Sequence, residues 1–388
     1  MIEENKKAEK TLWVSHFAVD TYSGFVNPIM PFIAAHLGMS LAITTLIIGL
    51  SHLCSSMLQP IFGFISDNCR KRFFIFWGML ITSIFIPMIG IAPSIFVLAI
   101  CLILGSVGNG FFHPQATSFI NLFSKPETLT KNMSAFLAAG TIGFAAGPII
   151  SSLIHDCFSE KALIYTSLPG LLCAFAIIKF VPKISHIPIT TPKIIFKKAI
   201  RDIFSSKPMK VLLCFSISKS LTTQSLCILL PFLWKSIGYS ASHIGILLSL
   251  YLIAGALGTM TSPKLEKRFG TRKVINGSLL SILPLSVIFA ITYQSIPLIS
   301  YLTFIIIGFF SMLSVPINMI LAHQVMPDYK SLTSGLIGGF SWGIVGIAMS
   351  LVGALAQQIG IINILITVAI FPAVFAYFTK YIPNKIGE

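Results

Sequence analysis

Charged residues are scarce in this 388-residue chain, and acidic ones are scarcer still. Only 10% of its residues are charged, and 12 aspartates and glutamates stand against 27 lysines and arginines. No polar segment between the apolar runs exceeds about 30 residues, which leaves no room for a soluble catalytic domain. We therefore expect a protein that is not an enzyme.

Cysteine motifs and a cleavable leader are also missing. The seven cysteines show neither a CxxC pair nor metal-ligand spacing, so we expect no disulfide framework, no metal site and no cofactor. The first residues, MIEENKKAEK, contain three glutamates and precede a span that is too long and too polar for a signal-peptide core. Residues 1–11 are therefore predicted to form a retained cytoplasmic tail.

Apolar residues are what the chain has in excess, at 55% of its composition. Apolar runs long enough to cross a bilayer recur twelve times, and only helices can supply so many spans of this length. We predict an all-α membrane protein of twelve transmembrane helices. The runs are residues 12–36, 42–65, 73–92, 95–122, 132–154, 162–181, 210–234, 242–263, 274–293, 296–324, 332–357 and 361–381.

The basic residues are distributed unevenly between the loops. With the N-terminus inside, 24 of the 27 lysines and arginines fall in inside segments, which is the positive-inside pattern. We therefore expect a multi-pass protein of the cell inner (plasma) membrane with both termini cytoplasmic. Because these residues are scattered over short loops without a stacking platform, we expect lipid as a partner and no nucleic acid.

The two halves of the chain resemble each other at an offset near 200. PFIAAHLG at Pro31 parallels PFLWKSIG at Pro231, and SDNCRKR at Ser66 parallels EKRFGTRK at Glu266. Such halves predict two pseudo-symmetric six-helix bundles with a substrate site between them near the midplane. The predicted domains are the bundles 12–181 and 210–381, a cytoplasmic linker 182–209 with one surface helix, and a cytoplasmic tail 382–388.

Two charged residues lie inside the apolar spans. Asp20 lies roughly 13 Å into a hydrocarbon core about 30 Å thick, and Lys219 occupies nearly the equivalent position of the second half. A carboxylate at this depth marks a functional site by default, and His16 lies one helical turn away. We predict that Asp20 and His16 couple transport to protons and that Lys219 neutralises Asp20 or binds substrate. The alternative is a static buried ion pair.

Further polar side chains fall within the spans. Histidines titrate near neutrality, and His113 precedes a proline within the glycine-rich run GSVGNGFFHP. For each of these residues the competing interpretation is a structural hydrogen bond. Besides Lys219, the predicted substrate-binding residues are His113, Asn109, Gln115, Gln224 and Asn318.

Two motifs point to moving parts. The loop GFISDNCRKR combines a small residue, a carboxylate at the membrane edge and a basic cluster, and it predicts a cytoplasmic gate formed by Gly63, Asp67, Arg70, Lys71 and Arg72. Simple positive-inside anchoring would explain the basic residues but not the aspartate. In GTIGFAAGP, Gly143 and Gly147 before Pro148 predict close helix packing.

These motifs resemble the major facilitator superfamily over the whole chain. GFISDNCRKR is similar to its signature loop between spans two and three, although Arg70 stands where glycine is usual, and Pro263 and Lys267 depart from the second copy. GTIGFAAGP resembles the fifth-span motif of proton-coupled antiporters. SHFAVDTYSGFVNPIMPF and GNGFFHPQAT look like the first and fourth spans of the fosmidomycin-resistance branch, whose members export drugs or metabolites.

The resemblance implies a monomeric secondary transporter that works by alternating access and exports a small organic molecule in exchange for protons. Lys219 and the histidines favour an anionic or zwitterionic solute. A proton symporter importing an organic nutrient or siderophore is the alternative within the same fold. An alternative of another class is a transport-dead membrane sensor or scaffold, which would be expected to carry a long regulatory loop or tail.

Overall fold

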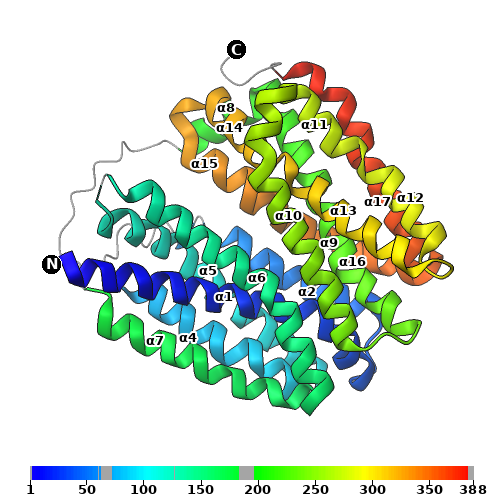
Figure 1. The fold of residues 1–388 in the computed structure, drawn as a ribbon, viewed down its shortest axis with the longest axis horizontal. Helices are drawn as coiled ribbons and strands as arrows, with labels where there is room; N and C mark the ends of the chain where they lie inside the picture. Colours follow the sequence, from blue (N-terminus) through cyan, green and yellow to red (C-terminus); the bar gives the residue numbers. More distant parts are fainter. Residues whose placement is uncertain (1, 60, 63–71, 126, 183–195, 383–388) are drawn as a thin grey trace. The chain divides into compact units, whose positions relative to one another are not determined.

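A computed structural model describes residues 2–59, 61–62, 72–125, 127–182 and 196–382. Throughout these ranges the secondary structure is helical, and they contain no strand (Figure 1). The predicted fold class, an all-α membrane protein, is confirmed. Ten helical segments are long and apolar enough to cross a membrane. Together with the first two helices they correspond to the twelve predicted spans.

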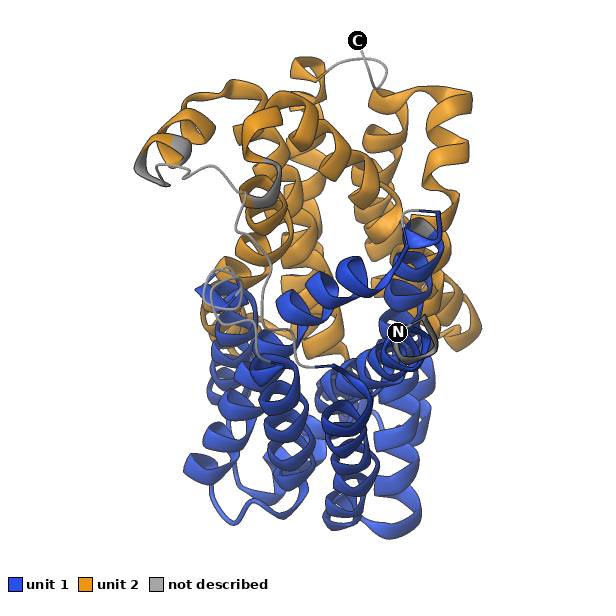
Figure 2. Ribbon diagram, turned by 90° about the vertical axis from the view of Figure 1, so that its left-hand side faces the viewer, with its two compact units in different colours: residues 1–190, 231–249 blue, residues 191–230, 250–388 orange. Residues whose placement is uncertain are grey.

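The chain divides into two compact units, coloured separately in Figure 2. Unit 1 comprises residues 1–190 and 231–249, and unit 2 comprises residues 191–230 and 250–388. Residues 231–249, at the end of one helix and the start of the next, group with unit 1. The helices that lie wholly in unit 1 are α1 (Ile2–His36), α2 (Leu41–Met57), α4 (Phe73–Met88), α5 (Ile95–Phe123), α6 (Leu129–Phe158) and α7 (Ser167–Phe180), with the short turns η1 (Ile89–Ile91) and η2 (Glu160–Thr166).

Unit 2 contains most of α9 and α10 and all later elements. Its elements are α8 (Phe196–Ser205), α9 (Lys207–Ser236), α10 (Ala241–Phe269), α11 (Thr271–Leu280), α12 (Ile282–Thr292), α13 (Pro297–Leu313), α14 (Val315–Val325), η3 (Pro327–Tyr329), α15 (Lys330–Ser334), the π-helical segment η4 (Gly335–Phe340), α16 (Ser341–Ile359), α17 (Ile361–Ala376) and η5 (Tyr377–Tyr381).

Residues 2–11, within the predicted N-terminal tail, form the first turns of α1. Glu9 is buried there, at 7% exposure, and its Oε1 accepts hydrogen bonds from Asn132 Nδ2 at 2.6 Å and Ser124 Oγ at 2.8 Å. A buried carboxylate is tolerated only where donors satisfy it, and here two donors do so. These bonds tie the start of α1 to the end of α5 and the start of α6.

Glycines let α1 and α6 approach each other closely. A Cβ added at Gly143 would lie 2.2 Å from the Phe17 carbonyl oxygen, and one at Gly147 would lie 2.4 Å from the Thr21 carbonyl oxygen. Gly24 of α1 lies similarly close to α6, because a Cβ added there would lie 2.6 Å from the Phe144 carbonyl oxygen. Small residues at such spacing allow backbones to touch in a membrane bundle, and this packing fixes where the polar side chains of α1 point.

The predicted linker contains the short helix α8, close to where a surface helix was expected. Tyr329 of η3 donates a hydrogen bond from its hydroxyl to Asp202 Oδ2 of α8 at 2.8 Å. This bond holds α8 to the segment that follows α14. Because the carboxylate stabilises the protonated phenol, it raises the pKa of Tyr329.

We expect Gly143→Ala to destabilise the protein by about 1–3 kcal/mol, since the new methyl group meets backbone that cannot move aside alone. The measurement is a thermal or denaturant midpoint of the purified protein in detergent. Gly277→Ala in α11 is the control, because no described atom lies within 4 Å of its added Cβ. Equal midpoints for the two variants would contradict the close α1–α6 contact.

Candidate functional site

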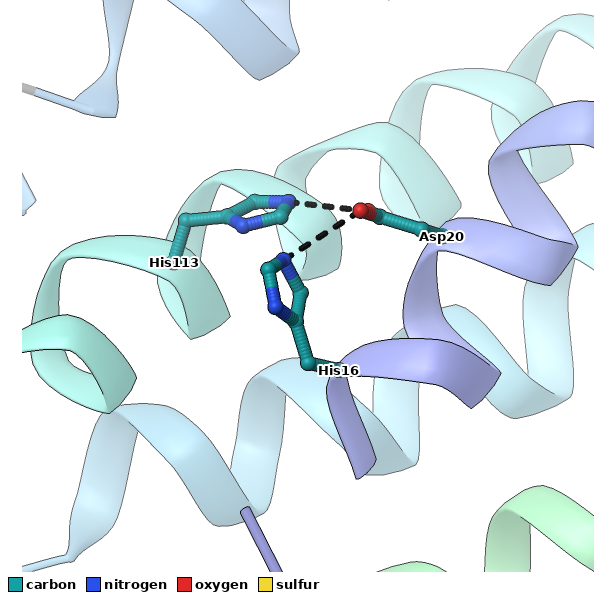
Figure 3. Close-up of side chains that lie close together, drawn as sticks. All are labelled: His16, Asp20 and His113. Carbon is teal, nitrogen blue, oxygen red and sulfur yellow. Dashed lines mark ion pairs between the residues drawn. The ribbon is translucent and has the colours of Figure 1, made fainter. Parts of the chain in front are cut away.

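Asp20 lies between two histidines inside unit 1 (Figure 3). Its Oδ2 is 3.2 Å from His16 Nε2, one turn earlier on α1, and its Oδ1 is 3.2 Å from His113 Nε2 on α5. The three side chains are 17%, 6% and 24% exposed for Asp20, His16 and His113, respectively. Each carboxylate oxygen therefore has its own imidazole partner.

The position of the His16 ring fixes where its proton lies. Its Nδ1 is 2.8 Å from the Phe136 carbonyl oxygen of α6, and because a carbonyl only accepts, Nδ1 must donate. The ring also stacks on Phe136 with centroids 4.0 Å apart. If the ring is neutral with its proton on Nδ1, then Nε2 carries only a lone pair, and it would face the carboxylate oxygen of Asp20, which is also an acceptor. The 3.2 Å contact with Asp20 therefore requires one additional proton, carried by either His16 or Asp20.

Gly140 of α6 makes room for this cluster. A Cβ added at Gly140 would lie 2.5 Å from both Asp20 Oδ2 and His16 Nε2. Along α6, the Phe136 carbonyl accepts a hydrogen bond from His16, Gly140 faces the cluster and Gly143 contacts the α1 backbone. The same helix face thus packs α1 and positions its ionisable side chains.

Lys219 lies in unit 2 with hydroxyl partners. Its Nζ donates hydrogen bonds to Ser278 Oγ of α11 and to Ser314 Oγ, between α13 and α14, both at 2.7 Å. Within the described part of the chain, no carboxylate forms an ion pair with Nζ. The contacts described for Asp20 lie within unit 1, and those described for Lys219 lie within unit 2.

A pocket within unit 2 is lined by Lys219 and Asn318, two of the predicted substrate-binding residues. Asn318 Nδ2 donates to the Leu212 carbonyl at 3.1 Å and to Ser216 Oγ at 2.6 Å, whereas its Oδ1 has no hydrogen-bond partner among the described residues. Trp342 of α16 also lines the pocket. The arrangement offers a cation, an amide oxygen and an aromatic surface to a small molecule.

The other predicted substrate residues make contacts between helices. Asn109 donates to Ser23 Oγ at 2.7 Å and accepts from Ser55 Oγ at 3.0 Å. Gln115 Oε1 accepts from the Ile75 backbone N–H at 2.9 Å, a donor in the first turn of α4 that has no partner within its own helix.

Gln224 lies on α9, where its Nε2 donates to the Trp342 carbonyl at 3.0 Å. His113, also predicted to bind substrate, instead faces Asp20.

Most of the predicted cytoplasmic gate lies outside the described residues, namely Gly63, Asp67, Arg70 and Lys71. Arg72 is described, and its guanidinium donates a hydrogen bond to the Val181 carbonyl at the end of α7. This contact anchors the start of α4 to the end of α7 within unit 1.

Sequence reasoning did not identify Ser278, Ser314 or Phe136. Serine and phenylalanine are frequent in this chain, and no spacing marks these three among the others. His113 was selected because of Pro114, but its partner Asp20 was not foreseen. The glycine run GSVGNG before His113 was the only available signal that α5 approaches another helix closely.

Comparison with known proteins accounts for this architecture. The sequence pattern of the Major Facilitator Superfamily matches residues 12–225 and 212–386. The chain belongs to this superfamily. It is therefore a membrane transporter of small molecules and not an enzyme. The two matched segments, which overlap slightly, correspond to the two halves inferred from the internal repeat.

Individual relatives are distant but cover nearly the whole chain. The fosmidomycin resistance protein of Escherichia coli is 24% identical over 96% of this chain and 91% of its own length. A quinolone resistance protein, NorA of Staphylococcus aureus, is 24% identical over 86% of this chain and 84% of its own.

Solved structures share the fold. A nucleoside transporter, NupG, superposes with a TM-score of 0.83 at 14% identity, covering 96% of this chain and 99% of its own. A D-xylose-proton symporter superposes with a TM-score of 0.75 at 14% identity, covering 99% of both chains.

We expect Gly140→Ala to lower the transport rate by about tenfold or more while folding is retained, because the methyl group would displace Asp20 or His16 by about an ångström. Transport in vesicles and the melting midpoint should be measured together. Thr141→Ala, an exposed neighbour on the same helix, serves as the control. Wild-type transport by Gly140→Ala would show that the cluster tolerates displacement.

Proposed function

We propose that the protein is a proton-coupled exporter, in which the cluster of His16, Asp20 and His113 holds a proton that is exchanged for a small organic solute. The observation that carries the proposal is the contact between His16 Nε2 and Asp20 Oδ2, which requires one proton beyond those of a carboxylate and two neutral imidazoles. Binding and release of that proton change the charge of a buried site by one unit.

The coupling step follows from the cost of charge in an apolar environment. With this proton, on either His16 or Asp20, the cluster has no net charge and tolerates enclosure between helices. Without it, the carboxylate faces a neutral His16 ring and favours a hydrated, open arrangement. Alternation between these arrangements gives alternating access, and the proton gradient is the only energy source that the proposal needs.

Support for export comes from the relatives. Two of them are named for resistance, to fosmidomycin and to quinolones, and resistance is the consequence expected of an exporter. The motif GTIGFAAGP, whose glycines contact α1, points the same way. We further propose that the protein acts as a monomer in the inner membrane, with both termini cytoplasmic as the basic loops indicate.

The alternative within the fold is proton-coupled import. A D-xylose-proton symporter shares this architecture, so the fold permits either direction. The two directions differ in the sign of solute movement under the same proton gradient. Proteoliposomes equilibrated with labelled solute on both sides and then acidified outside should lose solute if the protein is an antiporter. Accumulation of solute would instead establish symport.

The solute can be sought first by growth. Expression in a drug-sensitive strain should raise the tolerated concentration of one or more compounds in a panel that includes fosmidomycin, a quinolone and organic acids. The compound with the largest effect then serves in vesicles. A vector control and the Asp20→Asn variant separate transport from general stress.

We expect Asp20→Asn to lower the rate of proton-driven transport by at least about tenfold, because the amide cannot release a proton. Exchange of solute between the two sides should persist. Asp328→Asn, the same change at an exposed residue of η3, should retain both activities. Proton-driven concentration of solute by Asp20→Asn at the wild-type rate would refute the role of the cluster.

A further inference from the structure

We propose that the pocket around Lys219 in unit 2 binds the anionic group of an organic acid that also bears a hydrogen-bond donor, such as a hydroxy acid or an amino acid. The inference rests on the proposed function only in taking this bound acid as the transported solute. The inference adds that the solute carries a negative charge and a hydrogen-bond donor, two properties that the proposed function does not specify.

The charge follows from the surroundings of Lys219. The side chain is 6% exposed, and in the described part of the chain its ammonium contacts only neutral oxygen atoms. Hydroxyl groups replace part of the hydration that the ammonium loses on burial, but they supply no countercharge. An anion entering the pocket would supply that countercharge.

The serine network leaves the ammonium free to bind. Ser278 Oγ donates to the Phe310 carbonyl at 2.8 Å, so in its 3.0 Å contact with Ser314 Oγ it must be the acceptor. Both hydroxyl protons are thus committed, and both oxygens face Lys219 Nζ. Two of the three ammonium hydrogens are held by this network, and among the described residues nothing accepts the third, which remains for a ligand. The network therefore orients the cation without competing for the anion.

The need for a donor on the ligand follows from Asn318, which lines the same pocket. It is 5% exposed, and its Oδ1 has no hydrogen-bond partner among the described residues. An orphaned buried acceptor is costly, and a hydroxyl or ammonium of the ligand would satisfy it. Met312, Ile337 and Trp342 supply apolar surface for the remainder of the molecule.

The pocket has one wall where a side chain can be added. Gly338 lines it within the π-helical segment η4, and no described atom lies within 4 Å of a Cβ built there. Gly277, next to Ser278 on α11, is equally unobstructed but does not line the pocket. The same larger side chain can therefore be introduced at Gly338, inside the proposed site, and at Gly277, outside it.

The test is the melting midpoint of the purified full chain in detergent with defined probes. The probes are lactate, mandelate, hydroxymethylphosphonate and serine, each compared with its uncharged or charge-blocked amide or ester. At about 100 times its Kd, a ligand should raise the midpoint by roughly 2–4 °C. We expect at least one of the anions to do so and its blocked counterpart to have no effect. Absence of a shift with all four anions, or equal shifts with their blocked counterparts, would overturn the inference.

Variants locate the binding. Lys219→Gln and Gly338→Leu should lose the shift, whereas Gly277→Leu should keep it and show that an added leucine is compatible with folding. Retention of the full shift by Gly338→Leu would place the anion elsewhere and overturn the assignment. Asp20→Asn should still bind the anion, so failure of proton coupling and failure of anion binding give different results.

Discussion

A carboxylate within an apolar helix needs polar partners, and in unit 1 the rings of His16 and His113 supply them for Asp20. One histidine comes from the same helix and the other from α5, and each faces a different oxygen. The Phe136 carbonyl orients His16 and thereby determines that a proton must lie in its contact with Asp20. The chemistry of the cluster is thus set by one backbone acceptor on a third helix, α6, as much as by the ionisable residues themselves.

That acceptor is in place because α1 and α6 pack with almost no side chain between them. Phe136, Gly140, Gly143 and Gly147 follow one face of α6 at intervals of three or four residues. The glycines bring the backbones together, and the missing side chain at Gly140 leaves space for the His16 and Asp20 side chains. The packing of α1 on α6 and the geometry of the Asp20 cluster therefore depend on the same face of α6.

The sequence predicted the fold class and the two halves because bilayer length and backbone satisfaction leave few alternatives to helices. It also singled out Asp20, His16 and Lys219, since charge within an apolar run is visible without a structure. It foresaw His16 as a neighbour of Asp20, one helical turn away, but not the partners from other helices. The contact between Asp20 and His113 joins residues 93 positions apart, and the serines beside Lys219 are indistinguishable from many others. Asn109 and Gln115, which were predicted to bind substrate, also bond to neighbouring helices, as buried amides generally find partners.

The two units thus carry different groups, an Asp20 cluster with two histidines in unit 1 and a pocket with Lys219 in unit 2. In the proposed exchange, binding of solute is linked to release of the proton. The most direct test is to count protons released when the exported solute is added to purified protein in weakly buffered solution. About one proton per bound solute is expected for the wild type and none for Asp20→Asn, with solute binding retained in both. Equal proton release by the two proteins, or none by the wild type, would contradict the exchange of a proton at Asp20 for solute.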